Sequence, residues 1–285
     1  MSAELTIRAM RRPEVDTLVE WAAGEGWNPG LHDAEIFWAC DPAGFIAAEL
    51  DGELIGGGSI VAYPGRFGFM GFFIVQPEHR SQGLGRRLWF HRRDRLLARL
   101  GEGATIGMDG VFTMQPFYAD GGFVFSHRDL RFEGVGSRGT PAGAVVDARS
   151  VPFEKLLACD SAHFPAPRAD FLRAWIAQAG SRALAVPGPT GLRGFGVIRP
   201  CRQGYKIGPL FAAGAEVAEI LFTGLADHAA GEPIYLDVPE PNADAMALAA
   251  RHGMREVFGC ARMYLGPPPA LPQDQIFGVT TFELG

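Results

Sequence analysis

Residues Phe72 to Gly85, FFIVQPEHRSQGLG, are the segment on which the predicted fold depends most. Its first four residues are apolar, its last six read Arg-x-x-Gly-x-Gly, and apolar residues then recur at helical spacing as far as Leu100. A strand is therefore expected to run directly into a helix. The N-terminus of a helix carries unpaired N–H groups and a partial positive charge, and glycines let a phosphate approach the backbone. We interpret this junction as an anion site, to which Arg80 adds a charged donor.

The patterns on both sides of this junction predict a domain of class α+β, with a mixed, mostly antiparallel twisted sheet flanked by helices. Asp51-Gly52 separates two apolar runs and is typical of a hairpin turn. The sequence predicts strands at 4–10, 44–50, 54–63, 66–75, 105–109 and 122–132, and helices at 12–23, 32–40, 84–100 and 113–119.

The second half repeats this order without the opening strand, which indicates an internal duplication. Residues 134–143 hold four glycines and a proline, so we place a boundary there and expect domains at 1–137 and 138–285. Asp109 and Asp237 each close a strand, and Arg131 and Arg262 each follow a glycine by nine residues. The second half is expected to contain helices at 151–160, 168–179, 215–230 and 242–252, and strands at 182–187, 191–199, 205–212, 233–238 and 254–264.

Composition narrows the class of protein. The net charge is −6, which argues against a protein surface that binds nucleic acid. The four cysteines are too far apart in the sequence to form a zinc site. Neither a signal peptide nor an 18-residue apolar run is apparent, so we expect a cytoplasmic protein without a membrane, nucleic-acid or metal partner. The arginines of the long helix are read as a solvated face; they are Arg86, Arg87, Arg92, Arg93, Arg95 and Arg99.

The segment Ile74 to Gly85 resembles motif A of the GCN5-related N-acetyltransferase (GNAT) family, and the resemblance covers about residues 4–132. It implies that backbone amides of the glycine-rich loop hold the pyrophosphate of acetyl-coenzyme A and that the preceding strand splays to pair with pantetheine. The chain is similar, in particular, to bacterial two-domain members, tandem GNAT-like folds in which the second domain is degenerate. The donor-binding residues so implied are Phe73, Ile74, Val75, Arg80, Ser81, Gln82, Gly83, Leu84 and Gly85.

The resemblance also suggests two catalytic residues. Tyr118 lies where many family members place a general acid for the departing thiolate; the alternative is an aromatic core residue. The strand 69–73 has no carboxylate for a general base, which makes Asp109 the best substitute. Asp109 fits equally well as a cap of the helix that follows it.

The acceptor site is expected around the first interhelical loop, at Glu25, Trp27, His32 and Asp33, although such residues are more often solvated surface groups. The second half lacks an equivalent of Tyr118, with Ala249 in its place, and lacks the Arg-x-x-Gly-x-Gly turn. It should neither bind coenzyme A nor catalyse. We expect it to complete the acceptor pocket or to form an oligomer contact, such as that of a homodimer.

The sequence thus favours an N-acetyltransferase that moves an acetyl group from acetyl-coenzyme A to a primary amine of a small molecule, by direct attack in a ternary complex. Protein lysines are an alternative acceptor. A non-catalytic acyl-coenzyme-A sensor is the alternative from a different class.

Overall fold

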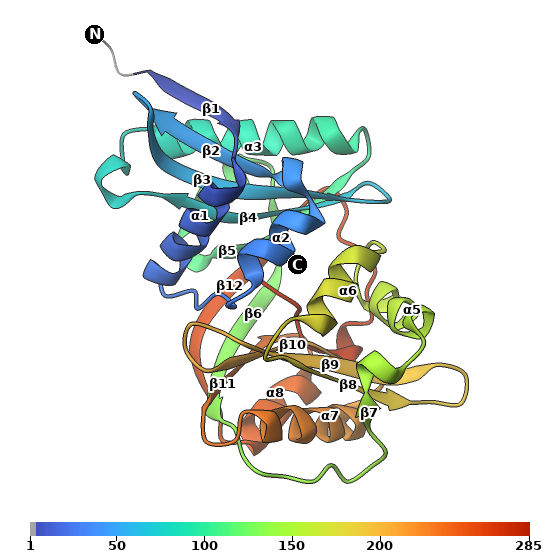
Figure 1. Cartoon of the computed structure of the whole chain (residues 1–285). Helices are drawn as coiled ribbons and strands as arrows, with labels where there is room; N and C mark the ends of the chain where they lie inside the picture. Colours follow the sequence, from blue (N-terminus) through green and yellow to red (C-terminus); the bar gives the residue numbers. More distant parts are fainter. Residues whose placement is uncertain (1–3) are drawn as a thin grey trace.

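The computed structural model describes residues 4–285, and its strands form one continuous twisted sheet with helices on both faces (Figure 1). The α+β class predicted from the sequence is confirmed. In the first half the elements are β1 (Leu5–Ala9), α1 (Arg12–Gly24), α2 (Asp33–Cys40), β2 (Phe45–Leu50), β3 (Glu53–Tyr63), β4 (Phe67–Val75), α3 (Leu84–Leu100), β5 (Thr105–Val111), α4 (Gln115–Asp120) and β6 (Val124–Val135).

The second half repeats this order, with the short strand β7 in the place of β1 and one strand, β13, added at its end. The sequence pattern missed both short strands. Its elements are β7 (Val146–Asp147), α5 (Phe153–His163), α6 (Ala169–Ala177), β8 (Arg182–Pro187), β9 (Leu192–Pro200), β10 (Tyr205–Ala212), α7 (Ala215–His228), β11 (Pro233–Pro239), α8 (Ala243–Arg251), β12 (Arg255–Leu265) and β13 (Ile276–Gly278).

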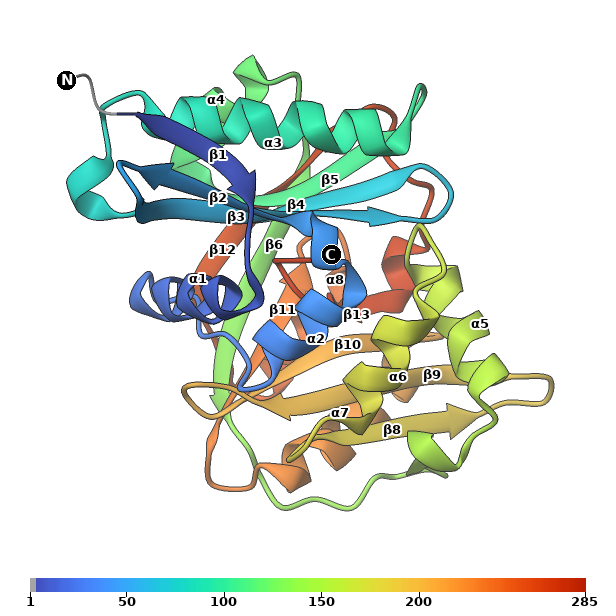
Figure 2. The same cartoon turned by 45° about the horizontal axis from the view of Figure 1, so that its top comes forward.

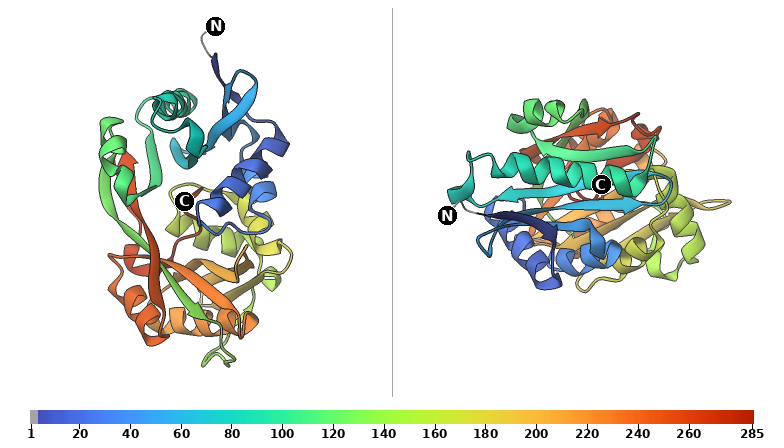
Figure 3. Two further views of the ribbon diagram at one scale, coloured as in Figure 1. Left: turned by 90° about the vertical axis from the view of Figure 1, so that its left-hand side faces the viewer. Right: turned by 90° about the horizontal axis from the view of Figure 1, so that it is seen from above.

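The two halves exchange their last long strands. The sheet order around the junction is β5-β12-β6-β11, so β12 of the second half pairs with β5 of the first, and β6 of the first pairs with β11 of the second. The left view of Figure 3 shows β6 (green) and β12 (red) running side by side from one half toward the other. A boundary near residue 137 divides the elements along the chain, but in space the sheet passes through it without a break.

The helices form layers on the two faces of the sheet. Helix α3 covers one face of the first half, while α1 and α2 lie on the other face, toward the second half (Figure 2). Helix α2 meets α6 across this region, where the rings of Phe37 and Trp175 stack with centroids 6.0 Å apart. An apolar core joins the halves there, which fixes their relative position.

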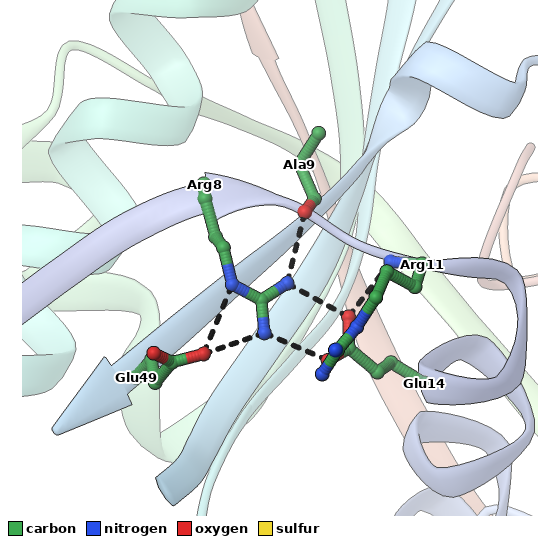
Figure 4. Close-up of polar contacts among 5 residues, drawn as sticks. All are labelled: Arg8, Ala9, Arg11, Glu14 and Glu49. Carbon is green, nitrogen blue, oxygen red and sulfur yellow. Dashed lines mark hydrogen bonds and ion pairs between the residues drawn. The ribbon is translucent and has the colours of Figure 1, made fainter. Parts of the chain in front are cut away.

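Strand β1 is held at the sheet edge by a cluster of charged side chains (Figure 4). Arg8 donates to Glu49 on β2 and to both carboxylate oxygens of Glu14 on α1, at 2.7 and 2.8 Å. Glu14 also accepts from the N–H of Arg11 at 2.7 Å, which caps the start of α1. The hydrogen bonds from Arg8, opposed by partial burial, lower the pKa of Glu14 to about 2.

Within residues 4–285, no helix combines the length and apolar character needed to cross a membrane. The same part of the chain has no group of three or more His, Cys, Asp or Glu side chains arranged to hold a metal ion.

Candidate functional site

The site begins where β4 separates from β5. The two parallel strands pair only from Phe67 to Met70, while on its other edge β4 stays paired with β3 as far as Val75. An irregularity in that pairing falls where Phe72 adopts a positive φ of 51°. Residues 73–75 thus keep an open edge toward β5, which an extended ligand can use for backbone hydrogen bonds.

The loop after β4 is a cradle of free backbone donors. Gly83 adopts a φ of +81° and α3 starts at Leu84, as the glycine-rich motif predicts. The N–H of Arg80 bonds to Pro77 and that of Arg87 to Gly83, but between them the N–H groups of residues 81–86 have no partner within the described chain. Together with the positive end of α3, this loop is built to hold an anion.

Arg80 links this loop to the first interhelical loop. Its Nε donates to the Val75 carbonyl at 2.8 Å, and its Nη2 forms an ion pair with Glu25. The guanidinium is therefore oriented beside the anion cradle and already bears a carboxylate partner. Glu25 thus lies at the entrance of the site, next to a residue predicted to bind the donor.

A cavity of about 570 Å³ extends from the cradle through the gap between β4 and β5. Many aromatic rings and methionines line it, namely Trp27, Met70, Phe72, Phe73, Trp89, Met108, Met114, Phe117, Tyr118, Phe258 and Phe282. Of the residues singled out in the sequence, it brings together Glu25, Trp27, Phe73, Ile74, Val75, Arg80, Ser81, Gly83, Gly85, Asp109 and Tyr118, whereas Gln82, Leu84, His32 and Asp33 do not line it.

Tyr118 projects from α4 into this cavity. It is 4% exposed, its ring stacks on Trp89, and a β-carbon at Gly110 would collide with it. Burial raises the pKa of the phenol well above its ordinary value, against the opposing effect of the Arg92 guanidinium. The hydroxyl makes no hydrogen bond within residues 4–285, so it stays protonated and free to donate.

Asp109 lines the cavity but is already engaged. Its two oxygens accept from Nε and Nη2 of Arg262 on β12, both at 2.7 Å, and the side chain is fully buried. Burial raises the pKa of Asp109 to about 8 although Arg262 lowers it, and the neighbouring carboxylate of Asp129 adds to the rise.

The arginines of α3 do not form one solvated face, which corrects the prediction from sequence. Arg92 is fully buried, and its Nη2 donates to the carbonyls of Ser59 and Gly71 at 2.6 and 2.5 Å. It thereby holds β3 and β4 where their pairing shifts, and burial lowers its pKa to about 9. Arg99 binds Asp41, and Arg86 lies over the ring of Phe90 beside the cavity. Charge alone predicted exposure, but the irregular strand supplies carbonyl acceptors to a buried guanidinium.

Two residues proposed for the acceptor site lie elsewhere. Asp33 is completely buried and pairs with Arg199 of β9 at 3.1 Å, so it joins α2 to the second half. His32 is half-buried beside it and outside the cavity.

The second half contains the same strand separation, but it is filled. Strands β10 and β11 pair in parallel only from Tyr205 to Ile207. Beyond that point β13 pairs with β10 through Leu210 and Phe211, and the N–H of Val279 bonds to the Asp237 carbonyl of β11 at 2.9 Å. The chain itself occupies the place that is open in the first half.

Four residues of the second half reach the cavity of the first, and none of them was predicted from the sequence. Phe258 and Cys260 arrive on the exchanged strand β12, and Phe282 and Glu283 on the segment that follows β13. They lie more than 130 positions from Tyr118 in the sequence, so only knowledge of the strand exchange would have found them.

Comparisons with known proteins agree with this geometry. A model of the acetyltransferase (GNAT) family matches residues 12–123, and a model of an acetyltransferase (GNAT) domain matches residues 156–278. The chain is 28% identical over 268 residues to the holothin acyltransferase of Pseudoalteromonas sp. (strain SANK 73390), which covers 93% of this chain and 90% of that protein.

Solved structures show the same fold over nearly the whole chain. A presumed acetyltransferase from Pyrococcus horikoshii superposes with a TM-score of 0.83 at 24% identity, covering 99% of this chain and 96% of that one. A tandem GNAT protein from the clavulanic acid biosynthesis pathway superposes with a TM-score of 0.63 at 17% identity, covering 93% of this chain and 100% of that one. The tandem arrangement predicted from the repeat is confirmed.

Proposed function

We propose that this chain, which belongs to the GNAT family of acyltransferases, transfers the acetyl group of acetyl-coenzyme A to the primary amine of a small molecule. The observation that carries the proposal is the continuity of the site. Four residues of the loop with free N–H groups, the open edge of β4 and Tyr118 all border one cavity; the four are Ser81, Gly83, Gly85 and Arg86. An anion cradle next to an unpaired strand edge suits a long donor with a pyrophosphate at one end and an amide-bearing arm at the other.

The residues present fit such a donor. The N–H groups of residues 81–86 and Arg80 would hold the pyrophosphate, and residues 73–75 would pair with the pantetheine arm. The donor supplies an activated acyl thioester. Tyr118 holds a proton at its hydroxyl for the departing sulfur, and the aromatic walls exclude water that would hydrolyse the thioester. Asp109 stays a candidate for the base, although Arg262 occupies both of its oxygens.

The position of the cavity favours a small acceptor over a protein lysine. Phe258 and Phe282 of the second half form part of its wall, so the site lies between the halves and not on an open face of the first. The relative described as a holothin acyltransferase supports an acyltransferase role, and it places holothin itself among the acceptors to be tested.

The decisive experiment measures free-thiol release from acetyl-coenzyme A by the full-length protein. The acceptor panel would contain holothin, aromatic and aliphatic monoamines, polyamines, amino acids and a lysine peptide. We expect acceptor-dependent release with one class of small amine. Release with the lysine peptide alone would favour protein acetylation. Binding of the donor without release for any acceptor would favour a sensor and overturn the proposal.

A further inference from the structure

The segment after β13 runs back between the two halves and ends beside β4. The C-terminus lies in the middle of the molecule in Figures 1 and 2. Residues 280–284 are all at most 6% exposed. The Tyr63 hydroxyl donates to the Leu284 carbonyl at 2.9 Å, and Arg168 donates to Thr280 and to the Gly285 carbonyl. These contacts from both halves hold the segment in one place.

Glu283 lies where β4 leaves β5. A β-carbon at Gly71 would overlap the carbonyl oxygen of Glu283, and the Ser59 hydroxyl lies 3.4 Å from the same oxygen. Gly71 is the last residue before Phe72, whose positive φ marks the irregularity in β4. The missing side chain at position 71 therefore makes room for the segment. Glu283 lines the cavity at this point, although the strand itself offers no carboxylate there.

The carboxylate of Glu283 is buried without a donor. The residue is 3% exposed, its side chain makes no hydrogen bond within residues 4–285, and its Oε2 is fully enclosed. Burying a charged carboxylate without a partner is strongly unfavourable. Burial raises its pKa, against the lowering effect of the Lys206 ammonium. The charged groups facing it are Lys206 on β10, Asp33 on α2, Arg131 on β6 and Arg199 on β9.

These neighbours are already engaged. Arg131 pairs with Asp237 at 2.6 Å, Arg199 pairs with Asp33, and the Lys206 ammonium donates to the Asn28 carbonyl at 3.1 Å. Among the carboxylates of this buried group, which are Asp33, Asp237 and Glu283, it is Glu283 that lines the cavity and lacks a hydrogen-bond partner within residues 4–285. A cationic group of a ligand would supply the missing donor.

We propose, on the basis of the acyltransferase function above, that Glu283 binds the ammonium group of the acceptor and takes a proton from it. The neutral amine then forms a C–N bond to the thioester carbonyl carbon, and the C–S electron pair goes to sulfur. Tyr118 gives its proton to that sulfur and regains one from the acylated nitrogen. The proton on Glu283 passes to solvent when the product leaves. Asp109 could bind the ammonium group and accept its proton only after releasing Arg262.

The same geometry defines the acceptor class. Within residues 4–285, Glu283 is the one cavity-lining carboxylate without a partner, because Arg262 occupies Asp109 and Arg80 pairs with Glu25. The walls beside it are the rings of Phe72, Phe258 and Phe282. A compact, apolar monoamine satisfies both features. A polyamine would place a second charge against these rings without a partner.

The test compares wild type with Glu283→Gln, using the best monoamine of the panel. We expect kcat/KM to fall by about 100-fold at neutral pH, in the usual range for a lost general base. Donor affinity, measured by calorimetry, should stay within about twofold. The residual activity should rise with pH as the free amine deprotonates, whereas wild type should level off at lower pH. Glu283→Asp should recover part of the activity. Glu256→Gln, the same change at an exposed position of β12, is the control.

The outcomes separate the two proposals. Wild-type activity together with an unchanged rate and pH profile in Glu283→Gln would overturn the role of Glu283 alone. Absence of thiol release by wild type with every amine would overturn both. A loss of activity accompanied by loss of donor binding and a lower melting temperature, without partial recovery in Glu283→Asp, would show a structural role and also overturn the inference.

Discussion

Arg262, on the last long strand of the second half, binds both carboxylate oxygens of Asp109, on β5 of the first half. An equivalent pair occurs at the matching positions of the repeat: Arg131 on β6 binds both carboxylate oxygens of Asp237 on β11, at 2.6 and 2.8 Å. Each arginine has crossed into the other half with its strand. Duplication and strand exchange together thus produce two buried ion pairs that fasten the halves to one another.

The two pairs should differ in their contribution to stability. Asp129 lies 3.4 Å from Arg262, so that arginine keeps a counterion when Asp109 is replaced, and burial already raises the pKa of Asp109 to about 8. Asp237 is different: burial would raise its pKa, but Arg131, with smaller contributions from Lys206 and Arg199, outweighs that effect and lowers it. Asp237→Asn should therefore destabilise by about 3–5 kcal/mol, and Asp109→Asn by about 1–2 kcal/mol. Urea unfolding at pH 7 measures both, and equal losses would contradict this difference.

The exchange of β6 and β12 predicts that neither half folds alone. A fragment of residues 4–140 would leave β5 without its partner β12 and expose the apolar cavity wall. We expect each separately produced fragment to be aggregated or lacking near-ultraviolet dichroism, and the two together to form a 1:1 complex with restored donor binding. Size-exclusion chromatography and calorimetry decide this. A monomeric, folded first fragment that binds the donor would be evidence against it.

Most elements of this fold follow from patterns within short windows of the sequence. The anion loop at Gly83 and the helix from Leu84 to Leu100 are local features, so periodicity and glycine positions sufficed to predict them. The repeat also matched Asp109 with Asp237, and Arg131 with Arg262. The pairing of these residues across the halves depends on which neighbouring strand β6 and β12 each join in the sheet. The entry of Glu283 into the first half's cavity depends on the same arrangement. Local pattern carries no information on that choice.

Two helix-start glycines allow a matched test of the donor site. Gly83 before α3 and Gly214 before α7 both have positive φ and open space where a β-carbon would lie. Valine costs about 1–2 kcal/mol of backbone strain at Gly83, and about 1–3 kcal/mol at Gly214, whose φ of 114° and ψ of 173° lie in a region essentially confined to glycine. Gly83→Val should weaken donor binding at least tenfold, whereas Gly214→Val should leave it unchanged, because β13 fills the second half's strand gap. Calorimetry should also give one donor site per chain in wild type. Two sites, or equal effects of the two variants, would refute this.

The charged cluster at β1 predicts a defined loss of stability in acid. Hydrogen bonds from Arg8 lower the pKa of Glu14 from 4.5 to about 2, so folding favours its ionised form. The resulting stabilisation is fully present above the unfolded-state pKa of 4.5 and disappears as pH falls toward 2. Glu14→Gln should cost about 1–2 kcal/mol at pH 7, and the difference from wild type should shrink below pH 4.5.

Urea unfolding of wild type and Glu14→Gln at a series of pH values tests this dependence. Glu53→Gln, at an exposed position of β3 with no ion pair in the described structure, is the control and should track wild type throughout. A pH-independent cost of Glu14→Gln would mean that its role in packing, rather than its charge, holds the start of α1.

Tyr118→Phe separates chemistry from binding. The phenol makes no hydrogen bond within residues 4–285 and stacks on Trp89, so removing its oxygen leaves the packing of α4 intact. We expect kcat to fall by about 10²- to 10³-fold, with donor affinity and melting temperature nearly unchanged. Because burial raises the pKa of Tyr118, wild type should keep its activity at alkaline pH instead of losing it near pH 10. An acyl donor whose thiol leaving group is more acidic should narrow the gap between variant and wild type, since such a sulfur departs with less need of a proton. An equal gap for both donors would place Tyr118 in the wall of the cavity and not in proton transfer.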